Sequence, residues 1–143
     1  MVRRALYTVL LGKYERLNAL PKIAQQGIDA FCFTDDPDLR STTWKVVHVV
    51  PEFALDSVRS QRLIKILGHP TLDAYDETLF IDGTVRLKVN PNEILDAWLA
   101  DADLALPEHS FRATLDEEFE QVIVGKLDSR ERVSEQRDHY ERL

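Results

Sequence analysis

The sequence predicts an α/β protein in which a mostly parallel sheet is flanked by helices. Short apolar runs alternate with amphipathic segments along most of the chain, as in doubly wound folds. The apolar runs are nearly continuous, which is typical of strands that are buried on both faces of a parallel sheet. Residues Asn90-Pro91-Asn92-Glu93 combine an N-cap, a proline at the first helical position and an acid at the third, and so mark the start of a helix.

The expected strands are short runs rich in β-branched, aromatic and aliphatic residues that end at glycine, proline or aspartate. They are 5–11, 28–34, 44–50, 78–81 with a resumption at 85–87, and a brief strand at 103–106. The expected helices have apolar residues at helical spacing or recognisable caps. They are 15–26, 54–68 with Gly68 as its stop, 91–100, 115–124 and a charged C-terminal helix at 129–143.

Length and composition restrict the class of protein. With 143 residues, of which 44% are hydrophobic, the chain fits a single domain over 1–143 with a real core. The formal charge of -7 argues against a nucleic-acid coat, which needs a positive excess. No run is long and apolar enough for a transmembrane segment, and the N-terminus lacks a signal-peptide pattern, so we expect a cytoplasmic protein. The single cysteine, Cys32, is expected to be a buried strand thiol.

Ligands bind such sheets beyond the carboxyl ends of their strands, so the residues after each strand are the first candidates. After the first strand, Gly12 permits close approach of the backbone to a ligand, and Lys13 could meet a phosphate. After the second, Asp35 could accept hydrogen bonds from ribose hydroxyls or a base. A tight turn explains the first pair equally well, and an Asx turn at Asp36-Pro37 is the alternative for the second. Dinucleotide and P-loop glycine spacings are both missing from the sequence.

The strongest candidate follows the fourth strand. Asp82 ends a hydrophobic run, and Gly83 would admit a bulky ligand beside it. A hard cation such as Mg²⁺ or Mn²⁺ that bridges a diphosphate prefers oxygen ligands of this kind. Because Asp-Gly-Thr is also a common turn sequence, a plain turn at 82–84 remains the alternative.

Two further groups carry charge. Arg59, Arg62 and Lys65 recur every third residue of one helix and could aim cations at a diphosphate, although solvated helix charges look the same. His69 directly follows that helix and could cap its last carbonyls or contact a ligand.

A second cluster gathers acid, base and cation within ten residues and could hold an acceptor or a metal, although surface charge explains much of it. It comprises His109, Arg112, Asp116, Glu117 and Glu118.

Several of these residues occur in an order that resembles a glycosyltransferase-like domain family. The family includes plant mucilage-related and bacterial polysaccharide-cluster proteins, and is distantly similar to glycogenin and to lipopolysaccharide galactosyltransferases. The resemblance covers about residues 5–120. It is carried by Tyr7-Thr8, Gly12-x-Tyr14, Phe33-Thr34-Asp35-Asp36, Trp44, Arg62-x-x-Lys65, His69, Tyr75-Asp76 and Phe80-Ile81-Asp82-Gly83.

The resemblance implies a GT-A fold, Rossmann-like, that binds a UDP- or GDP-linked sugar, usually with Mn²⁺ or Mg²⁺. It further implies hexosyl transfer to a hydroxyl of a glycan or other acceptor in polysaccharide or glycoconjugate synthesis. Carried over residue by residue, the resemblance places six residues at the nucleotide and diphosphate, namely Thr8, Tyr14, Asp35, Arg62, Lys65 and Gly83. It places Asp82 at the metal, and His109 and Arg112 at the sugar or acceptor. It assigns a catalytic role to Asp82 and to Glu117 or Glu118.

Two departures keep a second class of function open. The third position of the D-x-D metal motif is Thr84 rather than aspartate, and the chain is short for a GT-A enzyme with its acceptor half. The alternative is a noncatalytic module whose C-terminal helix associates with a larger transferase or with a second copy. A nucleotidyltransferase is a third option, disfavoured because the expected glycine-rich basic loop is missing after the first strand.

Overall fold

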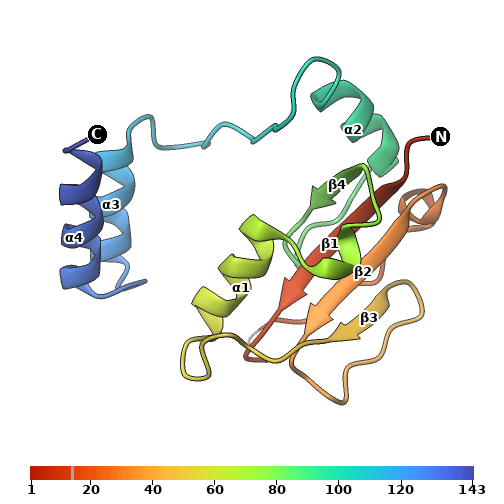
Figure 1. Cartoon of the computed structure of the whole chain (residues 1–143), viewed down its shortest axis with the longest axis horizontal. Coiled ribbons are helices and arrows are strands. Elements are labelled where there is room, and N and C mark those ends of the chain that lie inside the picture. Colours follow the sequence, from red (N-terminus) through yellow and green to blue (C-terminus); the bar gives the residue numbers. More distant parts are fainter. Residues whose placement is uncertain (14) are drawn as a thin grey trace. The chain divides into compact units, whose positions relative to one another are not determined.

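The computed structural model describes residues 1–13 and 15–143, and these form two compact units (Figure 1). The first unit spans Met1–Ala105 and the second Leu106–Leu143. Among the described residues, no helix has the length and apolar character needed to cross a membrane.

The first unit is built on four parallel strands, which confirms the predicted α/β class. In chain order its elements are β1 (Arg4–Leu10), the 3₁₀ turn η1 (Lys22–Gln25), β2 (Asp29–Thr34), β3 (Lys45–His48), α1 (Ser57–Leu67), the 3₁₀ turn η2 (Pro70–Leu72), β4 (Glu77–Phe80) and α2 (Pro91–Trp98). The strands lie in the order β3-β2-β1-β4, and β1 pairs through Ala5 to Leu10 with the whole of β2. We call the side where all four strands finish the carboxyl end of the sheet, and the side where they start the amino end.

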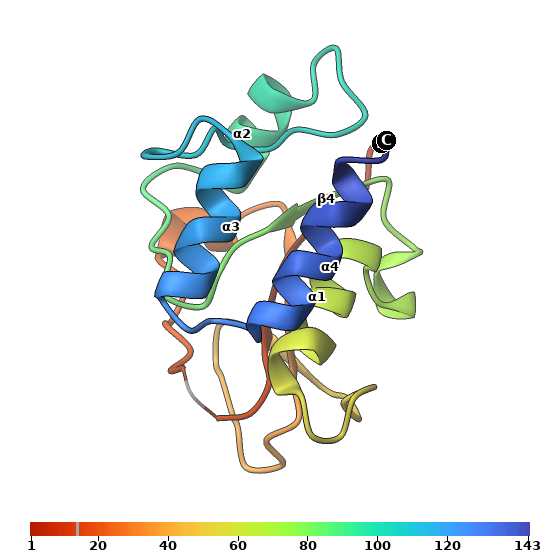
Figure 2. The same ribbon diagram turned by 90° about the vertical axis from the view of Figure 1, so that its left-hand side faces the viewer.

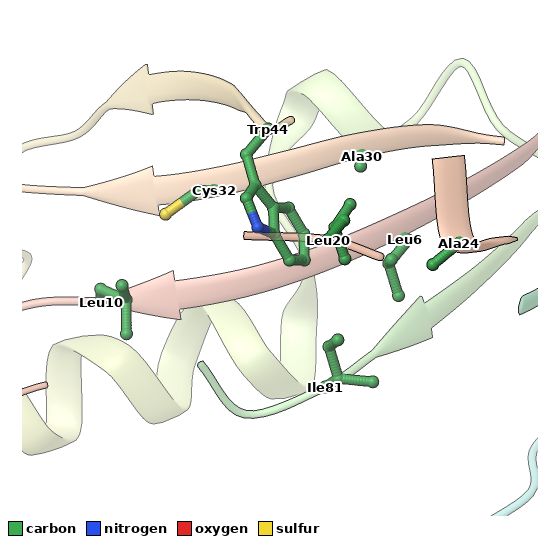
Figure 3. Close-up of a cluster of buried hydrophobic side chains, with 8 residues drawn as sticks. All are labelled: Leu6, Leu10, Leu20, Ala24, Ala30, Cys32, Trp44 and Ile81. Atoms are coloured by element: carbon green, nitrogen blue, oxygen red, sulfur yellow. The ribbon is translucent and has the colours of Figure 1, made fainter. Parts of the chain in front are cut away.

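Apolar side chains cover both faces of β1 and β2, as their continuous hydrophobic runs predict. On one face, which we call the loop-side cluster, the connection from β1 to β2 packs through Leu20 and Ala24 on strand residues such as Leu6 and Cys32. Figure 3 shows the indole of Trp44 reaching across this face towards Leu20.

On the opposite face, which we call the helix-side cluster, α1 and η2 pack on the sheet. Leu72 and Ile64 meet the aromatic side chains of Tyr7, Phe31 and Phe33. The alternation of side chains along each strand therefore divides the core into two layers.

The connection from β1 to β2 differs from the expected helix over 15–26, because only η1 forms there. Pro21 precedes that turn and lacks the N–H that a continuing helix would require. Apolar residues of this segment nevertheless pack on the sheet. The helical spacing of these residues therefore reflects packing and does not indicate a helix.

Two expected strands are also not formed. After β4 the chain turns at once, since Val85 N–H donates to the Asp82 carbonyl at 2.9 Å, and no strand follows at 85–87. Residues 103–106 have no strand partner among the described residues, and Leu104 is 74% exposed. Both runs are short and little buried, so their burial would not offset the conformational entropy that the backbone loses in a strand.

The second unit is a pair of helices, α3 (Leu115–Val124) and α4 (Arg130–Tyr140), which run side by side in opposite directions (Figures 1 and 2). Both helices were predicted. Phe119 and Val133 are buried between them, and Arg137 joins them by ion pairs to Asp116 at 3.2 Å and Glu120 at 3.0 Å.

Candidate functional site

The direction of the strand order changes between β1 and β4. The connection after β1 lies on the loop-side face through Leu20, whereas α1, which leads into β4, lies on the helix-side face through Ile64. The two connections therefore leave the sheet on opposite faces. In sheets of this topology a crevice opens at the carboxyl end between the two strands concerned, and ligands bind there. The residues that follow β1 and β4 are accordingly the candidate site.

A tight left-handed turn follows β1. Gly12 has a φ of 81° and Lys13 a φ of 56°, a region that glycine adopts without steric cost and other residues rarely visit. The carboxylate of Asp35 accepts a hydrogen bond from the N–H of Gly12, with 3.1 Å to each oxygen. Asp35 thus lies at the carboxyl end as predicted, and it fixes the backbone of this turn.

A charged pair lies next to it. Lys13 Nζ is 3.0 Å from Asp36 Oδ1, and the N–H of Asp38 also donates to Asp36 Oδ1 at 3.0 Å, so the expected Asx turn is confirmed. The N–H of Asp38 and then the Lys13 ammonium lower the pKa of Asp36, and Asp36 raises the pKa of Lys13. Both groups consequently stay charged at neutral pH.

Asp82 follows β4 and is exposed, with 54% of its side chain accessible. Its Oδ1 lies 3.7 Å from Nζ of Lys65, which comes from the last turn of α1. The same ammonium lies 4.4 Å from the ring centroid of Phe80, within cation–π range. The structure therefore places the carboxylate that follows β4 beside a cation from α1.

Gly83 has a packing role that the sequence did not reveal. It is buried, and a Cβ added there would lie 2.7 Å from Cδ2 of Leu10. The side-chain oxygen Oε2 of Glu15 lies 3.5 Å from the same point. The absence of a side chain at 83 is accordingly explained by the close approach of β1, and a contact with a ligand stays a prediction.

The other residues predicted for the nucleotide pocket are distributed differently. Thr8 is 0% exposed within β1, and its hydroxyl has no hydrogen-bond partner among the described residues. Tyr14 lies outside the described residues. Arg62 is exposed on α1, one helical turn before Lys65. Arg62 is thus presented to solvent on the helix that also carries Lys65.

Gly68 ends α1 as predicted, since its N–H donates to the carbonyl of Ile64 and its φ is 77°. The expectation that His69 caps this helix is wrong. Its Nδ1 instead accepts a hydrogen bond from the N–H of Thr71 at 3.2 Å and so caps η2, and its ring lies 4.7 Å from that of Phe33.

The predicted cluster in the second unit is held by local bonds around the start of α3. Nδ1 of His109 accepts hydrogen bonds from the N–H groups of Phe111 and Arg112, each at 3.1 Å. Arg112 forms an ion pair with Glu118, and Glu117 completes a capping box with Thr114. These contacts give each residue a structural role, and their predicted roles in catalysis or acceptor binding stay predictions.

Among the described residues, Asp82 belongs to no cluster of acidic or histidine side chains that would hold the expected Mn²⁺ or Mg²⁺ by protein donors alone. Over residues 1–13 and 15–143, no group of three or more His, Cys, Asp or Glu side chains could hold a metal. The charged neighbour of Asp82 is the Lys65 ammonium, which repels a cation, and Thr84 replaces the second acid of the motif. The predicted metal stays a prediction, and no step proposed below depends on it.

Two contacts at this end of the sheet were not predicted from the sequence. The Lys13–Asp36 pair joins the ends of two neighbouring strands, and the turn glycine before Lys13 was the available signal for it. Glu15 meets Gly83 across the β1–β4 junction, and nothing in the local sequence indicates that approach.

A parallel sheet in this strand order, with exposed charges at the carboxyl end beside the switch in direction, defines a Rossmann-like α/β protein. The chain belongs to the TOD1/MUCI70 glycosyltransferase-like domain family, whose model matches residues 20–143. The match begins after β1 and includes both helices of the second unit, whereas the resemblance in the sequence was placed at 5–120. No curated protein and no solved structure matches the chain.

Proposed function

We propose that the protein binds a nucleotide sugar at the carboxyl end of the sheet and transfers the sugar to a hydroxyl acceptor. The observation that carries this proposal is the exposed Asp82–Lys65 pair beside the β1–β4 switch in strand order. An ammonium held at that position can meet a diphosphate, because ligands of such sheets bind there. The family match supports the coarser statement of a glycosyltransferase-like domain.

Each side chain has a distinct part in the proposal. Lys65 faces the diphosphate, and Arg62 supplies a second cation from the same helix. Asp35 keeps lone pairs beyond its bonds to Gly12 and can accept a hydrogen bond from a ribose hydroxyl. The nucleoside would thus lie above β1 and β2, and the diphosphate towards β4 and α1.

The chemistry of transfer explains why cations are needed there. During the transfer the acceptor hydroxyl oxygen bonds to the anomeric carbon of the sugar and releases its proton to solvent. The bond from that carbon to the diphosphate breaks, and negative charge develops on the departing diphosphate. A positive charge fixed in advance stabilises that charge without reorganisation of the protein. We propose this electrostatic role for Lys65 and Arg62, and assign no general base.

The proposal is tested by titrating the full chain with UDP-glucose and GDP-mannose in a calorimeter. We expect saturable binding of one of them, and a loss of about tenfold or more in affinity for Lys65→Glu, because the reversed charge repels the diphosphate. Lys88→Glu, at another exposed lysine, is the matched control and should leave the affinity unchanged. Failure of both sugars to bind, or equal losses for the two variants, would contradict the proposal.

The second unit favours an additional candidate function, association with another protein chain. Its two helices bury few apolar residues, while many others remain exposed. The exposed set comprises Leu106 (78%), Phe111 (90%), Leu115 (47%), Val124 (71%), Leu127 (68%) and Leu143 (89%). We propose that part of this exposed apolar surface serves an interaction with another chain.

We propose that these residues mediate self-association of the chain. Light scattering on the full chain should show a concentration-dependent dimer that Phe111→Ser combined with Leu127→Ser reduces to monomer. A monomer at all concentrations for the unmodified chain would contradict self-association and leave the nucleotide-sugar proposal intact.

A further inference from the structure

Asp82 and Lys65 meet because of how α1 returns along the sheet. Figure 1 shows α1 running back from the carboxyl ends of the strands towards their amino ends. Side chains of a helix lean towards its N-terminus, so Lys65, in the last turn, reaches back towards the end of β4. The hydroxyl of Tyr7, which is 6% exposed, donates to the Lys65 carbonyl at 2.9 Å and anchors that turn on the sheet.

Three contacts position Lys65, one through its backbone and two through its ammonium. Its backbone is tied to Tyr7, its Nζ lies over the ring of Phe80, and the Asp82 carboxylate faces it at 3.7 Å. Its side chain is still 45% exposed, which leaves hydrogen-bonding positions open towards solvent. A lysine fixed in this way presents a charge to a ligand at lower entropic cost than a free surface lysine.

The carboxylate of Glu15, which approaches Gly83, lies on the opposite face of the sheet from Asp82. Phe80 belongs to the helix-side layer and Ile81 to the loop-side layer, and Asp82 meets α1 on the helix side. At Gly83, the missing side chain faces Leu10 and Glu15 on the loop side. Asp82 and Glu15 therefore face opposite sides of the sheet, and Asp82 offers a divalent cation a single carboxylate that already faces the Lys65 ammonium.

We propose that Lys65 takes the part that a divalent cation plays in related donor sites, so that the nucleoside diphosphate binds here without a metal ion. Asp82 is then a positioning residue that orients the ammonium. The inference rests on the proposed nucleotide-sugar site and adds what neutralises its diphosphate. An ammonium binds phosphate as a point charge, as the lysine of phosphate-binding loops does.

The experiment compares UDP and GDP binding to the full chain in EDTA and in excess Mg²⁺. We expect the affinity for the nucleotide that binds to agree within about twofold between the two conditions. In EDTA, Lys65→Met should weaken binding by about tenfold or more, whereas Lys65→Arg, which keeps the charge, should retain most of it. Asp82→Asn should cause a smaller loss than Lys65→Met, and Lys88→Met should cause none.

A second readout uses Mn²⁺ without nucleotide. Electron paramagnetic resonance should find no saturable Mn²⁺ binding that Asp82→Asn removes. Nucleotide binding that requires Mg²⁺, or an Asp82-dependent Mn²⁺ site, would overturn the inference while leaving the nucleotide-sugar site standing. If neither nucleotide binds under either condition, both proposals fail.

Discussion

Charged side chains at the two ends of the sheet are arranged in opposite ways. At the amino end, Arg4 binds Glu77 at 2.7 Å and Asp96 at 2.6 Å, and 16% of the Arg4 side chain is exposed. At the carboxyl end, Lys65 and Asp82 are 3.7 Å apart and about half exposed. A closely bonded and mostly buried arginine thus contrasts with a longer and more exposed lysine pair, and residue type alone does not separate the two.

The amino end is further closed by Asp29, at the start of β2. Its carboxylate accepts hydrogen bonds from Lys45 Nζ at 2.5 Å and from the Tyr75 hydroxyl at 2.6 Å. Arg3 completes the group by stacking over the Tyr75 ring at 5.1 Å. The Asp29 carboxylate is therefore bonded within the protein, and this group is expected to contribute to stability.

The largest expected effect is on stability at the amino end. Arg4→Met should lower the free energy of unfolding by about 2 kcal/mol, because Glu77 would be left half-buried without its partner. Urea unfolding monitored by circular dichroism measures this loss. Arg86→Met, at an exposed arginine, should change the unfolding midpoint little. Equal changes for the two variants would contradict a structural role for the Arg4 ion pairs.

The next effect concerns packing at the carboxyl end. Gly83→Ala should cost about 1 to 2 kcal/mol, because the new Cβ would displace the buried Leu10 side chain. Leu10→Ala creates space at that point, so the same glycine substitution should cost less in that background. Additive losses in the double variant would refute the packing explanation for this glycine.

A smaller effect depends on pH. The hydrogen bonds from Lys45 and then from Tyr75 lower the pKa of Asp29 in the folded protein. The unfolded chain therefore binds this proton first, so the stabilisation is present at neutral pH and is lost as the pH falls through the folded pKa. Because the side chain is 42% exposed, we expect about 1 kcal/mol or less. In Asp29→Asn, the unfolding midpoint should fall less steeply as the pH drops below about 4. The same dependence on pH as in the unmodified chain would contradict this.

The smallest stability effect is expected at Asp82. Asp82→Asn should change the free energy of unfolding by no more than about 0.5 kcal/mol, because an exposed pair at 3.7 Å contributes little. Thermal unfolding of this variant beside Arg4→Met makes the comparison within one assay. A loss at Asp82 as large as the loss at Arg4 would identify it as a structural pair.

Local signals in the sequence predicted much of the fold. The continuous apolar runs of β1 and β2 and the cap at Asn90, whose side chain accepts from Asn92 N–H at 2.9 Å, were sufficient for these elements. The expected helix over 15–26 failed because helical spacing of apolar residues also occurs in a connection that simply packs on a sheet.

The site was predictable only in part, for a related reason. Strand ends are local features, so Asp35 and Asp82 were found at the carboxyl end. The Lys65–Asp82 contact depends on the path of α1 across the sheet, and the bonds of His109 depend on the loop before α3. Contacts of that kind arise from tertiary geometry that spacing along the chain does not encode.

The most direct test of the central claim maps where a nucleotide binds. Amide resonances of ¹⁵N-labelled full chain should be followed during titration with UDP-glucose and GDP-mannose. We predict saturable shifts at Gly12, Asp35 and Gly83 at the carboxyl end, with Arg4 and Asp29 at the amino end unaffected. Shifts confined to the amino end, or no saturable shifts with either sugar, would contradict the account.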